Sequence, residues 1–152
     1  MKEILTVILL CSVLFASGCS KKENASTATG TVSFTVVDGF SGLPIENVKI
    51  VIPECEAVSV TDSSGKTERI TVPVIKDERY PIPEGYGTFS VLGFCEGYND
   101  YALFFAHISE QQDRSIKLYM FKTDTPFSSG APLSTIESPN KEWVSILMDK
   151  YR

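Results

Sequence analysis

From Gly30 onward, apolar and polar residues alternate with a period of two, which is typical of β-strands that bury one face. Turn-forming residues, chiefly Gly, Pro, Asn and Asp, separate the alternating runs, and no run of helical period lies between them. We therefore predict about seven strands, over residues 31–36, 48–52, 57–60, 69–75, 88–95, 101–108 and 115–121. This pattern predicts an all-β fold, an antiparallel sandwich occupying residues 30–123.

The pattern changes in residues 124–152. A stretch rich in Pro and Ser predicts a linker, and Ser138-Pro139 then fits an N-cap followed by proline at the first helical position. Helical spacing from residue 141 onward places five apolar side chains on one face: Trp143, Val144, Leu147, Met148 and Tyr151. A helix this short is only marginally stable by itself, so its apolar face is expected to pack against another surface. The sequence leaves open whether that surface is the chain's own sandwich or a groove on a partner protein.

The N-terminus predicts export. Residues 4–16 form an uncharged, mostly apolar run behind Lys2. As a helix the run would span roughly 20 Å, too short for the ~30 Å hydrocarbon core of a membrane, so it indicates a secretory signal. The small residues Ala16-Ser17-Gly18 then precede Cys19. This segment resembles the lipobox of bacterial lipoproteins, which implies a signal peptide over 1–18 and a lipid attached to Cys19.

Residues 19–29 are small and polar, as suits a flexible tether between a lipid anchor and a domain. Lys21 and Lys22 would lie against anionic lipid head groups. The sequence therefore predicts an extracytoplasmic protein that is lipid-anchored to the bacterial cell membrane, and to the outer membrane if the cell has two.

Composition excludes several functions. A net charge of -5 argues against a phosphate-binding surface, so no nucleic-acid partner is expected. The single histidine, His107, has no second histidine with which to bind a metal, and we expect it to be structural. The acidic residues Asp62, Asp77, Glu78 and Glu84 do not have the spacing of a calcium loop. We predict no metal, no cofactor and no catalytic residues.

Two cysteines, Cys55 and Cys95, remain after Cys19 is assigned to the lipid. In an oxidising compartment an even pair can form a disulfide. Two free, buried cysteines are the alternative, and the sequence alone does not decide between them.

Three segments, in order, resemble the carboxypeptidase regulatory-like domain, a transthyretin-like sandwich of the immunoglobulin type. They are the Gly-x-Pro-Ile entry at 41–50, the Thr-Asp-x-x-Gly turn at 61–67, and the strand at 87–91 with its Gly-Tyr turn at 97–98. In the second segment Gly65 suits a backbone with positive φ. The resemblance covers residues 30–123 and implies an accessory module without chemistry of its own.

Together these observations predict a non-catalytic, membrane-tethered module that binds an envelope protein or a glycan. Exposed aromatic side chains and the terminal helix are the candidate partner-binding residues: Tyr80, Tyr86, Tyr98, Trp143 and Leu147. Two alternatives are a glycan-binding accessory lipoprotein of a surface polysaccharide system and a structural envelope protein that self-associates.

Overall fold

The structure is a computed structural model, and it describes residues 28–76, 85–125, 131–139 and 141–152. The signal peptide, Cys19, most of the tether and Tyr80 lie outside these residues, so what the sequence indicates about them stays a prediction. In the described ranges no helix has both the length and the apolar character needed to cross a membrane.

The described chain is built mainly from strands, as predicted. In chain order they are β1 (Thr29–Asp38), β2 (Lys49–Ile52), β3 (Ala57–Val60), β4 (Ile70–Pro73), β5 (Tyr86–Phe94), β6 (Tyr101–Ser109), β7 (Asp113–Met120) and β8 (Leu133–Ile136). A short 3-10 helix, η1 (Pro53–Cys55), joins β2 to β3. The helix α2 (Lys141–Tyr151) follows β8, which confirms the predicted C-terminal helix.

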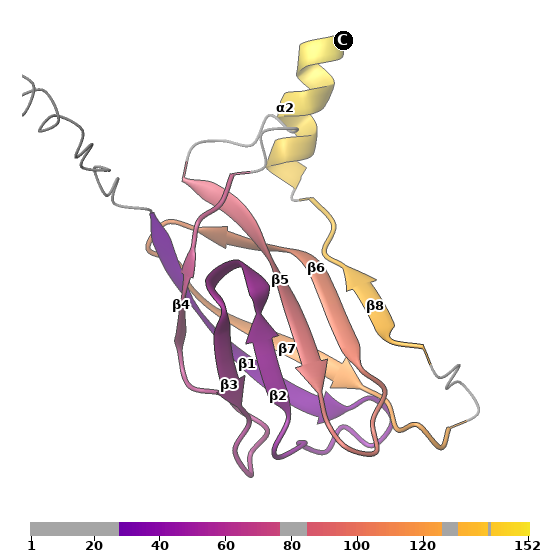
Figure 1. The fold of residues 1–152 in the computed structure, drawn as a ribbon. Coiled ribbons are helices and arrows are strands. Elements are labelled where there is room, and N and C mark those ends of the chain that lie inside the picture. Colours follow the sequence, from indigo (N-terminus) through magenta and orange to yellow (C-terminus); the bar gives the residue numbers. More distant parts are fainter. Residues whose placement is uncertain (1–27, 77–84, 126–130, 140) are drawn as a thin grey trace, which may run out of the picture.

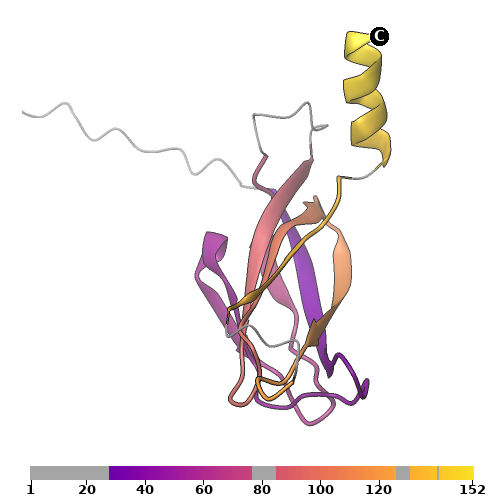
Figure 2. The same ribbon diagram turned by 90° about the vertical axis from the view of Figure 1, so that its right-hand side faces the viewer.

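The strands form two packed sheets, which confirms the predicted sandwich (Figures 1 and 2). One sheet has the strand order β4-β1-β7 and the other has the order β3-β2-β5-β6-β8. The prediction that all neighbours are antiparallel is wrong at two pairs, because β1 pairs parallel with β7 and β6 pairs parallel with β8. In both pairs a long stretch of chain intervenes, which is what parallel neighbours require.

The core lies between the two sheets and consists of the residues that the alternation places inward. Side chains from both sheets are almost completely buried there, among them Val32, Phe34, Ile50, Phe89, Val91, Ile108, Leu118 and Met120. Apolar burial of this kind is the main force that holds two sheets together.

Part of the predicted linker is a strand. Leu133–Ile136 forms β8 at the edge of the five-stranded sheet, where the Tyr101 and Thr135 hydroxyls lie 2.6 Å apart. The segment is short, and its middle residues, Ser134 and Thr135, do not stand out from the polar sequence around them. Its strand structure therefore comes from pairing with β6 rather than from a local pattern.

The turn at 61–67 has the predicted conformation. Gly65 has φ of 73°, and a Cβ there would lie 2.5 Å from the Val36 carbonyl oxygen. The Asp62 carboxylate accepts hydrogen bonds from the backbone amides of Ser64 and Lys66 and from the Ser64 hydroxyl. Asp62 is therefore committed to a turn rather than to a cation site.

Cys55 and Cys95 are both free and half-buried, so the structure has two free cysteines rather than a disulfide. Phe94 pairs with Lys49 at the start of β2, whereas Cys55 follows the far end of β2. At ~3.3 Å per residue the two cysteines lie at least roughly 13 Å apart along the strand, beyond the ~7 Å that a disulfide tolerates. Burial, and then the charge of Glu96, raises the pKa of the Cys95 thiol.

Candidate functional site

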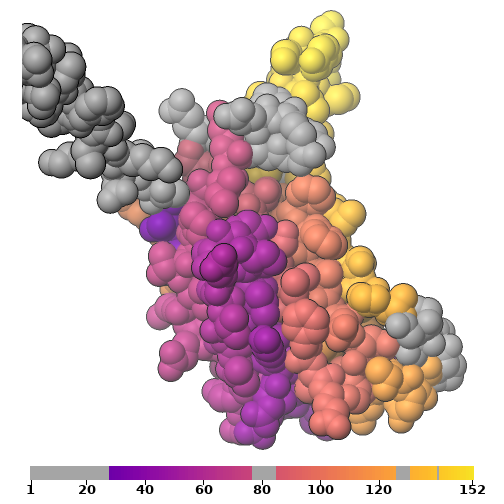
Figure 3. Space-filling view, in the orientation of Figure 1, coloured from indigo at the N-terminus to yellow at the C-terminus, as the bar shows by residue number. Residues whose placement is uncertain are grey.

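Apolar side chains form a patch on the solvent-facing side of the five-stranded sheet, and we call this patch the apolar face. It looks toward the viewer in Figures 1 and 3. The register aligns one row across four strands, from Val58 through Val51 and Leu92 to Ala102. Outward positions of a sheet exposed to water are usually polar. Members of the face that are clearly exposed are Val58, Val60, Phe94, Phe104, Phe105 and Ile136.

A β-bulge places two phenylalanines on this face. Phe89 pairs with Ala106 and Val91 pairs with Leu103, so Ser90 faces two residues of β6, Phe104 and Phe105. Phe105 has φ of 58°, a left-handed conformation that disfavours L side chains. The extra residue breaks the alternation, and both rings are exposed to water, by 39% and 41%. Bulges re-aim side chains in this way beside functional sites.

The Glu54 side chain crosses from η1 to the bulge. Because β2 ends at Ile52, β5 has no strand beside Ser90, and the Glu54 carboxylate takes the place of a ladder carbonyl. Its Oε1 accepts a hydrogen bond from the Ser90 amide at 2.8 Å. This bond holds the carboxylate beside Ser90 on β5, the strand that separates it from the two phenylalanines.

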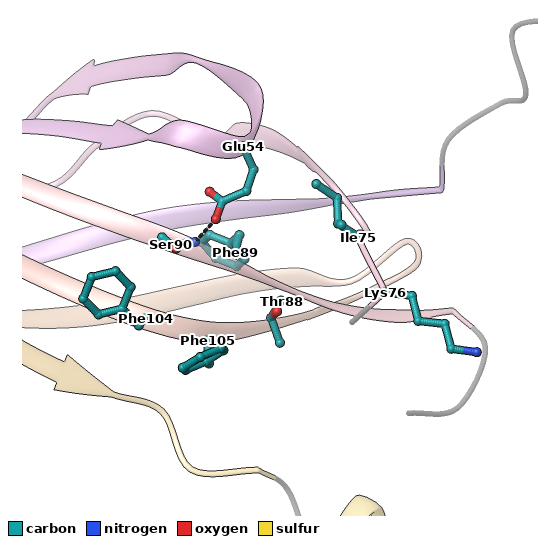
Figure 4. A pocket seen from close by; sticks show the side chains of 8 residues that line it. All are labelled: Glu54, Ile75, Lys76, Thr88, Phe89, Ser90, Phe104 and Phe105. Carbon is teal, nitrogen blue, oxygen red and sulfur yellow. Dashed lines mark hydrogen bonds between the residues drawn. The ribbon is translucent and has the colours of Figure 1, made fainter. Parts of the chain in front are cut away.

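These groups line a shallow pocket of about 230 Å3. Figure 4 shows Glu54 pointing at Ser90, with the Phe104 and Phe105 rings on the other side of β5. The full lining is Glu54, Ile75, Lys76, Thr88, Phe89, Ser90, Phe104 and Phe105. The pocket therefore joins aromatic walls to one carboxylate, while the Lys76 side chain extends away from both.

The second candidate region is the base of α2. The helix projects beyond the ends of β5 and β6 (Figures 1 and 2), and Trp143 is its buried residue. The Trp143 ring lies 4.5 Å from the His107 ring and 5.9 Å from the Tyr86 ring, centroid to centroid. The rest of the helical apolar face is exposed, Leu147 included. The sandwich therefore covers one residue of that face and leaves the others in solvent.

An ion pair fixes the chain just before α2. Arg114 Nη2 lies 2.8 and 2.9 Å from the two carboxylate oxygens of Glu137, and the Glu137 carboxylate also accepts the His107 amide. His107 Nδ1 is 3.4 Å from Glu137 Oε1. Burial, opposed by the Glu137 charge and assisted by the Arg114 charge, lowers the pKa of His107. The histidine therefore packs as a neutral ring under Trp143.

The structure brings two of the predicted partner-binding residues together and separates the others. Tyr86 and Trp143 are in edge-to-face contact. Tyr98 lies at the opposite end of β5, where its hydroxyl donates to Asp38 Oδ2 at 3.3 Å. Burial, and then the charge of Asp38, raises the pKa of Tyr98, in keeping with a structural role. Tyr80 lies outside the described residues.

The apolar face itself was missed by sequence reasoning. The signal was present in the two most apolar strands, 88–95 and 101–108, where apolar residues occupy both parities and Phe104-Phe105 are adjacent. A strand with one solvent-exposed face needs apolar residues only at every second position. Apolar residues at the other, outward-facing positions therefore indicated a surface that contacts something other than water.

Within the described ranges no group of three His, Cys, Asp or Glu side chains could hold a metal ion. The His107 side chain lies against the Glu137 carboxylate and the Trp143 ring. The candidate site therefore consists of exposed apolar side chains, two phenylalanine rings and one carboxylate.

No family model matches the chain, and no curated protein matches it. Among solved structures, a C-terminal interface mutant of a type II cohesin–X–dockerin complex from Acetivibrio cellulolyticus is similar, at 21% identity and a TM-score of 0.44 over 67% of this chain. An N-terminal interface mutant of that complex is similar at 15% identity and a TM-score of 0.40 over 68% of this chain. The chain spans 63% and 64% of the matched chains' lengths. Similarities at this level assign no function.

Proposed function

We propose that the protein is a non-catalytic module of the cell envelope that binds a protein partner through the apolar face. The observation that carries this proposal is the patch of exposed apolar residues on this side of the sheet, which includes Val58, Phe94 and the re-aimed pair Phe104 and Phe105. Contiguous apolar patches on a soluble domain mark interaction sites. Aromatic side chains are enriched among the residues that contribute most to binding.

A photo-crosslinking amino acid tests this proposal in the native host. Placed at Phe104 it should yield an adduct of defined mass, whereas placed at Tyr119 it should yield none. Tyr119 is the matched control, because it is an exposed aromatic residue on β7, in the other sheet. Equal adducts at both positions, or none at Phe104, would contradict the proposal.

The lipid anchor at Cys19 is part of the proposed function and rests on the sequence. The Cys19→Ala variant should move from the membrane fraction to the soluble fraction and lose incorporation of a palmitate analogue. An unchanged membrane fraction would show that the N-terminus is not lipid-modified at this residue.

We retain the carboxypeptidase regulatory-like resemblance as a proposal. The sandwich and the left-handed Gly65 in the 61–67 turn support it. The glycan-binding alternative depended on Tyr80 and Tyr86, and the Tyr86 ring is in contact with Trp143. We therefore propose a protein as the partner.

A further inference from the structure

Glu54 supplies the one carboxylate of the pocket lining. Glu54 Oε1 accepts the Ser90 amide, and no described residue donates a hydrogen bond to Oε2. Lys76, the other charged residue of the lining, extends away from Glu54 and from the two phenylalanines (Figure 4). A group seated in the pocket therefore meets negative charge on one side.

The opposite side of the pocket is aromatic. Phe104 and Phe105 expose their rings, and the faces of aromatic rings attract cations. Lys and Arg side chains carry apolar methylene groups below a cationic head, so they match an apolar wall that ends at a carboxylate. An acidic side chain would be repelled by Glu54, and a purely apolar one would leave that carboxylate without a counter-charge.

The size of the pocket suits one side chain. Its volume of about 230 Å3 is below the ~300–1,000 Å3 of sites that enclose a whole small molecule. It opens onto the apolar face, since Phe104 pairs with Ile136 of β8, which is 67% exposed. A partner lying on the face can therefore insert one side chain into the pocket.

We propose that this pocket binds a Lys or Arg side chain of the protein partner, with the methylene groups against Phe104 and Phe105 and the cationic head at Glu54. The inference rests on the proposed function, because it names the partner's chemistry at the same face. The net charge of -5 on the chain adds long-range attraction for a basic partner.

Nuclear magnetic resonance on the protein, purified from its native host in a non-ionic detergent, tests this inference. The probes are acetyl-arginine amide, acetyl-lysine amide and acetyl-glutamate amide. We expect saturable shifts of the Ser90 amide and of the Phe104 and Phe105 ring signals with the two cationic probes. Binding of the glutamate probe should be weaker by about tenfold or more, since its charge has the sign of Glu54.

Glu54→Gln is the decisive variant, because a glutamine oxygen can still accept the Ser90 amide while the charge is lost. It should weaken binding of the arginine probe by about fivefold or more at low salt. Glu46→Gln, the same change at an exposed residue that does not line the pocket, should leave binding unchanged. A slow, unchanged exchange of the Ser90 amide would show that the Glu54→Gln variant keeps the bulge.

Equal binding of the glutamate probe, undiminished binding by the Glu54→Gln variant, or no shift with any probe would overturn the inference. The proposed function has a separate readout, the adduct at Phe104. An adduct without any preference for cationic probes would leave protein binding in place and remove only the assignment of a basic side chain.

Discussion

The outer faces of the two sheets differ sharply although their inner faces are alike. On the three-stranded sheet the outward positions are mostly polar, and two of them, Ser33 and Ser115, share a hydrogen bond of 3.0 Å across β1 and β7. On the five-stranded sheet many of the equivalent positions are apolar, among them Val58, Leu92, Phe94 and Ile136, although Lys49, Thr88 and Ser90 also face outward. Folding requires apolar residues only on the inner faces. The apolar outer face is therefore the part of the surface whose composition stability does not explain.

Two ion pairs formed by neighbouring residues of β7 differ in their exposure to solvent. On the three-stranded sheet Arg69 pairs with Asp113 in the open, with side chains 70% and 51% exposed. Arg114, the next residue of β7, pairs with Glu137 where both are largely covered. The first pair lies on the solvent-exposed surface, whereas the second joins β7 to the segment between β8 and α2.

The largest expected effect comes from the shared core. Phe34→Ala should lower the free energy of unfolding by about 3–5 kcal/mol, because it leaves a cavity between the sheets. Tyr119→Ala, on the outer face of the same sheet, should cost less than ~1 kcal/mol. Urea unfolding with an unchanged slope measures both. A similar loss for the two variants would mean that inner and outer faces are not distinct.

The two ion pairs give the next largest difference. Arg114→Ala should cost about 1–3 kcal/mol, because it leaves the half-buried Glu137 carboxylate without its main donor. Arg69→Ala should cost less than ~1 kcal/mol, as exposed pairs do. Unfolding curves at low and high salt would check this order, and a reversed order would contradict it.

Substitutions in the bulge should affect binding and stability to different extents. Phe105→Gly should change the free energy of unfolding by no more than about 1 kcal/mol, since glycine relieves the left-handed strain that the phenylalanine bears. The same variant should no longer bind the two cationic probes. Phe104→Gly is the control, because its backbone has no such strain to relieve and glycine weakens a strand. If Phe105→Gly were the more destabilising of the two, the strain would have no functional meaning.

The smallest effect is a pH dependence at the base of α2. Burial lowers the pKa of His107 below its ordinary value of 6.5, so the unfolded chain binds the proton more readily than the folded chain. The contribution of His107 to the free energy of unfolding is therefore fully present above about pH 6.5, and it decreases as the pH falls toward the folded-state pKa. Trp143, the one tryptophan of the chain, reports this through its fluorescence. The His107→Gln variant should remove the titration, and an unchanged titration would assign it to another group.

Much of the fold could be read from the sequence, because burying one sheet face leaves a period of two in the strands. Val32, Phe34 and Val36 are examples that the structure buries as expected. The parallel pairing of β1 with β7 could not be read, since it joins segments about eighty residues apart and leaves no local pattern. The edge strand β8 was hidden for a similar reason, as it depends on β6.

The candidate site was harder to predict than the fold. Of the aromatic residues that the sequence singled out, Tyr86 and Trp143 contact each other, but Tyr98 is held by Asp38 at the other end of the sandwich. The pocket depends on a bulge, and a bulge is a register shift that no spacing of Phe104 and Phe105 reveals. Glu54 joins the site only because β2 stops before Ser90.

Oxidative footprinting of the protein in intact envelopes and after purification compares the two outer faces in one experiment. We expect Phe104 and Phe105 to be protected in the envelope and to become reactive after purification, while Tyr119 reacts equally in both. Equal reactivity of Phe104 and Phe105 in the two preparations, or protection confined to Tyr119, would contradict a binding role for the apolar face.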